Sequence, residues 1–171
     1  TTIIYPGLTQ FSSSLEDTIL EAGGTTLVTI VRTSGSEGAL TANLNITGSA
    51  TTGSDFTVDG LTFDSHEGEI FATASFADGE STYTFAVTAS DDLSDETDET
   101  LQFTITGLAY PLSGTRFFPT ATIGTRAQHT ITILDYGQQF STNKVIINTQ
   151  GQKINGATGD GVSPNEFELT R

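Results

Sequence analysis

The segment from Asp91 to Glu99 is the part of the sequence that is richest in groups able to do chemistry. Its nine residues, DDLSDETDE, carry six carboxylates. Carboxylates at this density repel one another, and free solvation, a basic partner or a bound hard cation such as Ca²⁺ relieves the repulsion. The runs 81–89 and 100–106 on either side alternate between apolar and polar residues, as strands do. The pattern therefore predicts an acidic loop between two strands.

Three more acidic residues stand beside predicted strands that are distant in the sequence: Glu21, Asp55 and Asp135. If successive strands are antiparallel, these residues and the acidic loop all fall at one end of the domain. An odd number of extra strands between Asp55 and Asp91 would send the loop to the opposite end, whereas an inserted hairpin would not. The convergence favours a site for Ca²⁺, which takes about six to eight oxygen ligands, over loops that are acidic only because they are solvated.

The rest of the chain indicates an all-β fold. Thr, Val, Ile and Phe, which favour strands, and Gly, which favours turns, are abundant. The run 40–47 is the clearest strand, because Leu40, Ala42, Leu44 and Ile46 alternate with polar residues. Seven or more such runs with short turns between them predict an antiparallel β-sandwich.

The chain divides into three predicted regions. Residues 1–14 are expected to form an N-terminal arm that packs on a neighbour, and residues 15–136 the sandwich. Residues 137–171, which are rich in Gln, Asn, Gly and Thr, are expected to form a C-terminal extension. The long connection 107–125 carries several aromatic residues, which we expect to fold back over the core or to form a patch for a partner.

Charge and composition limit the possible partners. The net charge is −15, from 21 acidic and six basic side chains. Such charge disfavours nucleic acid and anionic membranes as partners and favours cations, although acidity also serves solubility. The chain has no Cys, so disulfides and thiolate metal sites are excluded. No run approaches the roughly 18 apolar residues of a membrane span, so no membrane insertion is expected.

Catalytic motifs are scarce, and we expect no enzyme. The histidines are His66, in a polar turn, and His129, which we expect to pack within a strand. No Gly-x-Ser-x-Gly elbow or phosphate-binding loop occurs. Acidic residues are plentiful, but no pair is set apart as the two carboxylates of a glycosidase would be. The aromatic residues fall mostly on predicted core faces, which gives a sugar-binding platform little support.

Five segments, taken together and in order, resemble the Calx-β domain, a family found in sodium–calcium exchangers and in bacterial extracellular proteins. They are EAGGT from Glu21, GSATTGSDF ending at Phe56, FADGE from Phe76, the acidic loop, and ITILD ending at Asp135. The resemblance covers residues 15–136. It implies a seven-stranded, immunoglobulin-like sandwich whose Ca²⁺-binding members hold several ions at one end.

The resemblance also implies a set of ligands. The residues at its Ca²⁺-binding positions are Glu21, Asp55, Asp91, Asp92, Glu96 and Asp135. Glu99 matches an acidic position of the motif that is not itself a ligand. Ion-rich members continue with further Asp after the last strand, where this chain has Tyr136 and Gly137. The resemblance therefore implies one or two calcium ions, or none, as in members that have lost binding.

These observations together predict a non-enzymatic, calcium-binding β-sandwich that acts as a structural or interaction module on an extracellular surface or in a virion. Its expected partners are proteins, namely the subunits of a larger assembly, contacted through residues 1–14 and 137–171. A capsid decoration protein is slightly favoured over a repeat of an adhesin. The alternatives are a metal-free scaffold of the same fold and a carbohydrate-binding or hydrolytic domain.

Overall fold

The computed structural model describes residues 5–12, 14–66, 69–91, 96–110 and 121–135, together with the strands 145–148 and 166–169. Every regular element in these ranges is a strand. No helix long and apolar enough to span a bilayer occurs among them. Asp92, residues 111–120 of the aromatic-rich connection and most of the predicted extension lie outside the described residues.

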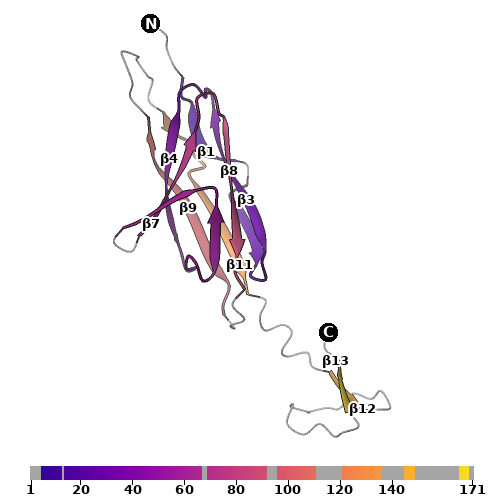
Figure 1. Ribbon diagram of the computed structural model, residues 1–171. Coiled ribbons are helices and arrows are strands. Elements are labelled where there is room, and N and C mark those ends of the chain that lie inside the picture. Colours follow the sequence, from indigo (N-terminus) through magenta and orange to yellow (C-terminus); the bar gives the residue numbers. More distant parts are fainter. Residues whose placement is uncertain are drawn as a thin grey trace.

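Two sheets pack face to face as a sandwich (Figure 1). The first sheet contains, in spatial order, β10 (Thr122–Ile123), β1 (Leu8–Phe11), β3 (Thr25–Thr33), β8 (Thr82–Ala89) and β5 (Phe56–Asp59). The second contains β2 (Glu16–Leu20), β11 (Gln128–Leu134), β9 (Glu99–Ala109), β4 (Leu40–Gly48), β7 (Glu69–Phe76) and β6 (Thr62–His66). A separate pair consists of β12 (Val145–Asn148) and β13 (Glu166–Leu169), which are antiparallel.

The hydrophobic core lies between the two sheets. Alternate residues of each long strand face inward, as the sequence pattern predicts for half-buried strands. At its centre the rings of Phe85, from the first sheet, and Phe103, from the second, meet edge to face with centroids 5.1 Å apart. The predicted all-β, immunoglobulin-like sandwich is therefore confirmed. It departs from a purely antiparallel arrangement at two edges, because β1 runs parallel to β10 and β2 runs parallel to β11.

The first residues of the chain depart from the prediction. Leu8–Phe11, assigned in advance to an arm outside the sandwich, form β1 and pair with β3. Phe11 is fully buried in the core. The predicted start of the domain at residue 15 is therefore wrong for these residues. A four-residue strand shows too few alternating positions to stand out, and it follows Pro6 and Gly7, two residues typical of turns.

A buried arginine ties this N-terminal segment to the body of the domain. Arg32 is only 3% exposed. Its Nε and Nη2 donate to the Pro6 carbonyl at 3.1 and 3.0 Å, and further bonds reach the carbonyls of Glu37, Gly38 and Glu80. The guanidinium also lies over the Phe76 ring, 5.7 Å from its centroid. We call this cluster the arginine clasp. It fixes three loops at the end of the sandwich where β3 finishes.

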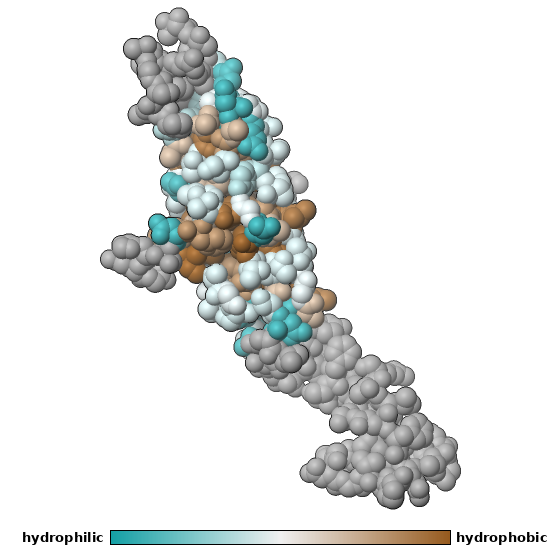
Figure 2. All heavy atoms as spheres, in the orientation of Figure 1, coloured by the Kyte–Doolittle hydropathy of each residue, from teal (hydrophilic) through white to brown (hydrophobic). Residues whose placement is uncertain are grey.

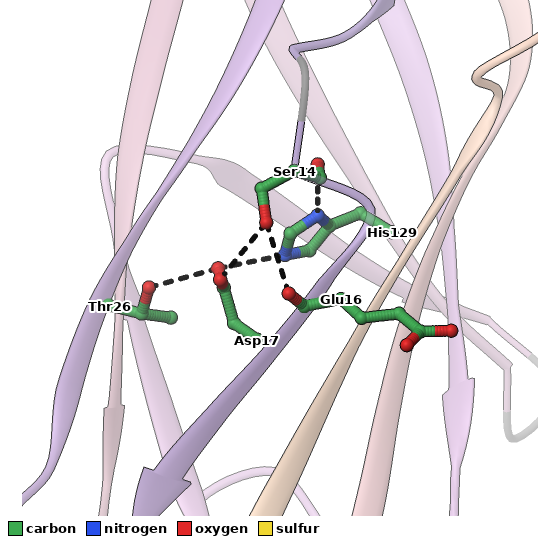
Figure 3. Close-up of polar contacts among 5 residues, drawn as sticks. All are labelled: Ser14, Glu16, Asp17, Thr26 and His129. Carbon is green, nitrogen blue, oxygen red and sulfur yellow. Dashed lines mark hydrogen bonds and ion pairs between the residues drawn. The ribbon is translucent and has the colours of Figure 1, made fainter.

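A second polar cluster joins the segment before β2 to β3 and β11 (Figure 3). The Asp17 carboxylate accepts hydrogen bonds from the hydroxyls of Ser14, at 3.2 Å, and Thr26, at 3.0 Å. His129, 2% exposed, has Nε2 3.3 Å from an oxygen of Asp17 and Nδ1 3.2 Å from the Ser14 carbonyl oxygen. Its ring packs 5.6 Å from that of Phe11. His129 is therefore packed inside a strand, as expected, and holds three strands together.

Four strands separate Asp55 from Asp91, and their order decides where the acidic loop lies. β5 runs away from Asp55, β6 and β7 form a hairpin that joins the second sheet, and β8 returns to the first. This hairpin places two strands between β5 and β8, so β8 still runs antiparallel to β5. The acidic loop therefore begins at the same end of the sandwich as Asp55.

Candidate metal centre

Four loops or strand ends meet at the end of the sandwich opposite the arginine clasp. The register places the last residues of β2 and β11 side by side, with Leu20 opposite Leu134. It also places Ile133 opposite Glu99 at the start of β9, and Phe56 at the start of β5 opposite Ala89 at the end of β8. The residues next to these strand ends are the predicted acids. Their convergence, derived from strand direction alone, is what the structure shows.

The acids surround a narrow pocket. Carboxylate oxygens of Asp55, Glu96 and Glu99 all lie within 4.8 Å of one another. Glu21 and Asp135 line the same pocket, along with Thr97 and Ile133, and none of the lining residues is basic. The enclosed cavity measures about 10 Å³, which is room for roughly one water molecule or one bare cation. Five carboxylates from four separate segments therefore face a space of ionic size.

Asp55 is held by its own loop. The Thr51 N–H donates to its Oδ2 at 2.5 Å, while the Asp55 N–H donates to the Thr51 carbonyl at 3.0 Å. Its carbonyl accepts from the Ser90 N–H at 2.9 Å, which ties the loop to the end of β8. The small residues that precede Asp55 let the chain close this tight turn. The carboxylate thus has a fixed position.

Glu96 and Asp135 are linked directly. The Glu96 N–H donates to Asp135 Oδ2 at 2.7 Å. This bond joins the acidic loop to the end of β11, two segments that are remote in the sequence. A negatively charged acceptor shortens and strengthens such a hydrogen bond. Asp135 therefore has a positioning role in the loop in addition to lining the pocket.

Glu21 is the most buried of the acids, at 7% exposed. It follows β2, and its N–H donates to the Leu134 carbonyl at 3.0 Å. The turn after it is tight: a Cβ on Gly24 would lie 2.5 Å from the Leu20 carbonyl oxygen. A larger residue at position 24 could not let the chain return into β3 this closely. The Gly-Gly pair noted in the sequence therefore sets where Glu21 lies.

Glu99 has the most perturbed acidity of the cluster. Burial raises the pKa of its carboxyl from 4.5 to about 7, with further contributions from the negative charge of Asp55, a side-chain hydrogen bond to Asp55 and the charges of Glu96 and Glu21. Carboxylates that crowd one site disfavour each other's charge in this way. The same crowding makes a site that a divalent cation would neutralise.

The structure thus brings together four of the six residues predicted as ligands: Glu21, Asp55, Glu96 and Asp135. Asp91 is exposed and lies outside the residues that line the pocket. Glu99, which the motif counts as acidic but not as a ligand, lies within the cluster. The sequence identified Glu99 only as an acid of the loop, because its place in the cluster depends on the register that sets it opposite Ile133, two residues before Asp135.

The donor set fits Ca²⁺ in chemistry and in size. Carboxylate oxygens are the ligands that Ca²⁺ prefers, at about 2.3 to 2.6 Å, so oxygens on opposite sides of one ion lie about 4.6 to 5.2 Å apart. The carboxylate oxygens of Asp55, Glu96 and Glu99 lie within 4.8 Å of one another, so all three can reach one ion. Mg²⁺ requires shorter, octahedral contacts and keeps its waters, so a crowded carboxylate pocket suits it less well.

No protein-family model matches the chain, and no curated protein matches it in sequence. Several solved structures match its fold. The Calx CBD2 domain aligns with a TM-score of 0.59 and 16% identity over 81% of this chain and 92% of that one. The Calx CBD1 domain in its apo form aligns with a TM-score of 0.54 and 20% identity over 74% and 95%.

A longer structure, the calcium binding domain CBD12 of CALX1.1, aligns with a TM-score of 0.51 and 22% identity over 75% of this chain. The chain spans 44% of the length of that structure. At these identities the likeness is one of fold. The fold of this chain is Calx-β-like, as its sequence motifs predicted.

Proposed function

We propose that the domain is a calcium-binding β-sandwich that serves as a non-enzymatic structural or interaction module. The observation that carries the proposal is the meeting of carboxylate oxygens of Asp55, Glu96 and Glu99 within 4.8 Å at the end of a Calx-β-like sandwich. Asp55 comes from one loop and the two glutamates from another, so the folded state creates the cluster.

One ion in this pocket would be held by Asp55, Glu96 and Glu99, with Glu21 and Asp135 as the remaining carboxylates of the lining. Asp91 and Asp92 belong to the same loop as Glu96, and we assign them to a second, outer ion. One ion in the pocket and one outer ion make a total of one or two calcium ions, depending on whether the outer site is filled.

Bound Ca²⁺ would neutralise the crowded carboxylates and join the β4–β5 loop, the β8–β9 loop and the end of β11 through one centre. Those segments are already linked by the bond from the Glu96 N–H to Asp135 and the bond from the Ser90 N–H to the Asp55 carbonyl. The ion would add cross-links that do not depend on side-chain packing. The role we assign to it is therefore stiffening of one end of the module.

The setting we propose is extracellular, either a cell surface or a virion, with protein subunits as partners. Extracellular calcium modules have a Kd of about 10⁻⁴ to 10⁻³ M, so a site of this class would be filled at the millimolar calcium concentration outside cells. The net charge of −15 argues against nucleic acid or anionic lipid. Between the two assemblies we keep the capsid decoration protein ahead of the adhesin repeat.

Thermal unfolding tests the proposal. We compare the protein in EDTA, in about 1 mM Ca²⁺ and in about 1 mM Mg²⁺. A Kd of about 0.1 mM would raise stability by about 1.4 kcal/mol, a rise in Tm of about 3 to 5 °C, selective for Ca²⁺. Glu96→Gln should abolish the rise. The matched control is Glu16→Gln, which makes the same change at an exposed residue of β2.

The metal-free scaffold gives a different result. If the carboxylates only repel one another, Glu96→Gln raises the Tm equally in EDTA and in Ca²⁺, and Ca²⁺ does not change the Tm of the wild type. That pair of results would exclude the calcium proposal and leave the sandwich as a scaffold.

A further inference from the structure

A pocket of about 610 Å³ opens on the outer face of the second sheet, over β9, β4, β7 and β6. It shares no residue with the acidic pocket. The register identifies its face: Asn43, Thr73 and Thr62 stand opposite one another on three neighbouring strands, while their neighbours Leu44 and Ala72 are buried. Its volume falls within the roughly 300 to 1,000 Å³ of pockets that bind small molecules.

A β-bulge shapes this pocket. Asn43 pairs with Gly107 and Leu44 pairs with Ile105, so Thr106 is an extra residue in β9. Its hydroxyl donates to the Asn43 carbonyl at 3.3 Å. A bulge bends its strand and increases the local twist, which curves the sheet. Gly107 leaves room beside it for the Asn43 amide, whose Nδ2 would lie 3.3 Å from a Cβ at that position.

Two phenylalanines line the pocket without serving the core. Phe71 stands on the outer side of β7, since Ala72 and Ala74 on either side of Thr73 face inward. Phe63, on the edge strand β6, pairs with the inward-facing Ala72 and is 38% exposed. Neither belongs to the core nor to the described residues that pack against it. Apolar residues are exposed at mid-height of the molecule, close to the β6–β7 hairpin (Figure 2). These aromatic residues are therefore left available to a ligand.

The polar groups that line the pocket are short and neutral, with one exception. They are the Asn43 amide, the hydroxyls of Thr62, Thr73 and Thr106, and the Asp64 carboxylate. An amide and a hydroxyl both donate and accept hydrogen bonds, and a carboxylate accepts several. No basic side chain is among the lining residues.

We propose that this pocket binds a neutral saccharide. A sugar ring has C–H faces that pack on aromatic rings and hydroxyls that need both donors and acceptors, which is the combination that Phe71, Asn43 and Asp64 supply. Anionic ligands, including sulfated and uronic-acid glycans, are disfavoured by Asp64 and by the net charge of −15. Five of the eight lining residues are polar, which distinguishes the pocket from an apolar groove for a hydrophobic peptide.

Isothermal titration calorimetry tests this with the full chain in EDTA, so that the result does not depend on calcium. The probes are neutral hexasaccharides of β-1,4-glucose, β-1,4-xylose, β-1,4-mannose and α-1,4-glucose, with a uronic-acid hexasaccharide and an unstructured hydrophobic peptide for comparison. At least one neutral saccharide should bind. Phe71→Ala and Asn43→Ala should each weaken that binding tenfold or more, whereas Phe71→Tyr, which keeps the ring, should retain it.

The matched control is Ser75→Ala, on the same face of β7 but outside the pocket, and it should bind as the wild type does. Melting temperatures show that each variant is folded. The proposal is overturned if no neutral saccharide binds at millimolar concentration. It is also overturned if Phe71→Ala leaves binding unchanged, or if only the acidic saccharide or the peptide binds.

Discussion

The raised pKa of Glu99 gives a prediction in which pH and calcium act on the same carboxyl. Burial and the neighbouring acids raise this pKa from 4.5 to about 7. Between these two values the native state binds more protons at Glu99 than the unfolded chain does. The free energy of unfolding should therefore fall as pH rises from about 5 to about 7.5 in EDTA.

The size of the effect follows from the same shift. The difference between 4.5 and about 7 corresponds to at most about 3.4 kcal/mol. The Glu99 side chain is partly exposed, so solvent screens part of this, and we expect about 1 to 2 kcal/mol. Glu99→Gln removes the charge and keeps the shape. At pH 8 in EDTA the variant should be more stable than the wild type by that amount, and at pH 5 nearly equal to it.

Urea unfolding from pH 5 to pH 8 in EDTA measures this difference, with Glu16→Gln as the control for loss of an exposed carboxylate. Calcium should remove the pH dependence of the wild type, because the ion replaces the proton. Calorimetry at pH 7 in buffers of different ionisation enthalpy should then show release of about half a proton per Ca²⁺. A wild-type free energy that is flat or rises over this range, with no difference from Glu99→Gln, would refute the reasoning.

Two further predictions concern the other parts of the sandwich. Phe11→Ala should lower the free energy of unfolding by about 3 to 5 kcal/mol, because it leaves a cavity at a fully buried site. Tyr5→Ala, at an exposed residue, should change the free energy of unfolding little. Equal effects of the two substitutions would mean that residues 8–11 are a dispensable arm. Arg32→Met should lower the free energy of unfolding by about 3 to 5 kcal/mol, because four carbonyl oxygens lose their hydrogen-bond donor. The rise in Tm with Ca²⁺ should be unchanged. Loss of that rise would mean that the two ends of the domain are coupled.

The features that depend on the alternation of apolar and polar residues and on strand direction could be predicted from the sequence. The run 40–47 shows its two faces in every residue, and strand direction alone brings Glu21, Asp55 and Asp135 together. Features that depend on a single residue in a pairing were not predictable. Thr106 forms a bulge only because β4 pairs with β9 in one particular register. Residues Leu8–Phe11 form a strand only because one edge of β3 is free to pair with them. Glu99 entered the cluster through burial, which one sequence does not show.

The two ends of the sandwich differ in how the chain enters and leaves. It enters beside the arginine clasp, at Pro6, and leaves at Asp135 beside the acidic pocket, at the opposite end of the long axis (Figure 1). Tension applied between Pro6 and Asp135 would therefore run along the strands and load the ladders of β1 with β3 and of β11 with β2 and β9 in shear. Many hydrogen bonds would then have to break together. A cation beside Asp135 would reinforce the exit point, so the calcium concentration would set how much force the domain withstands.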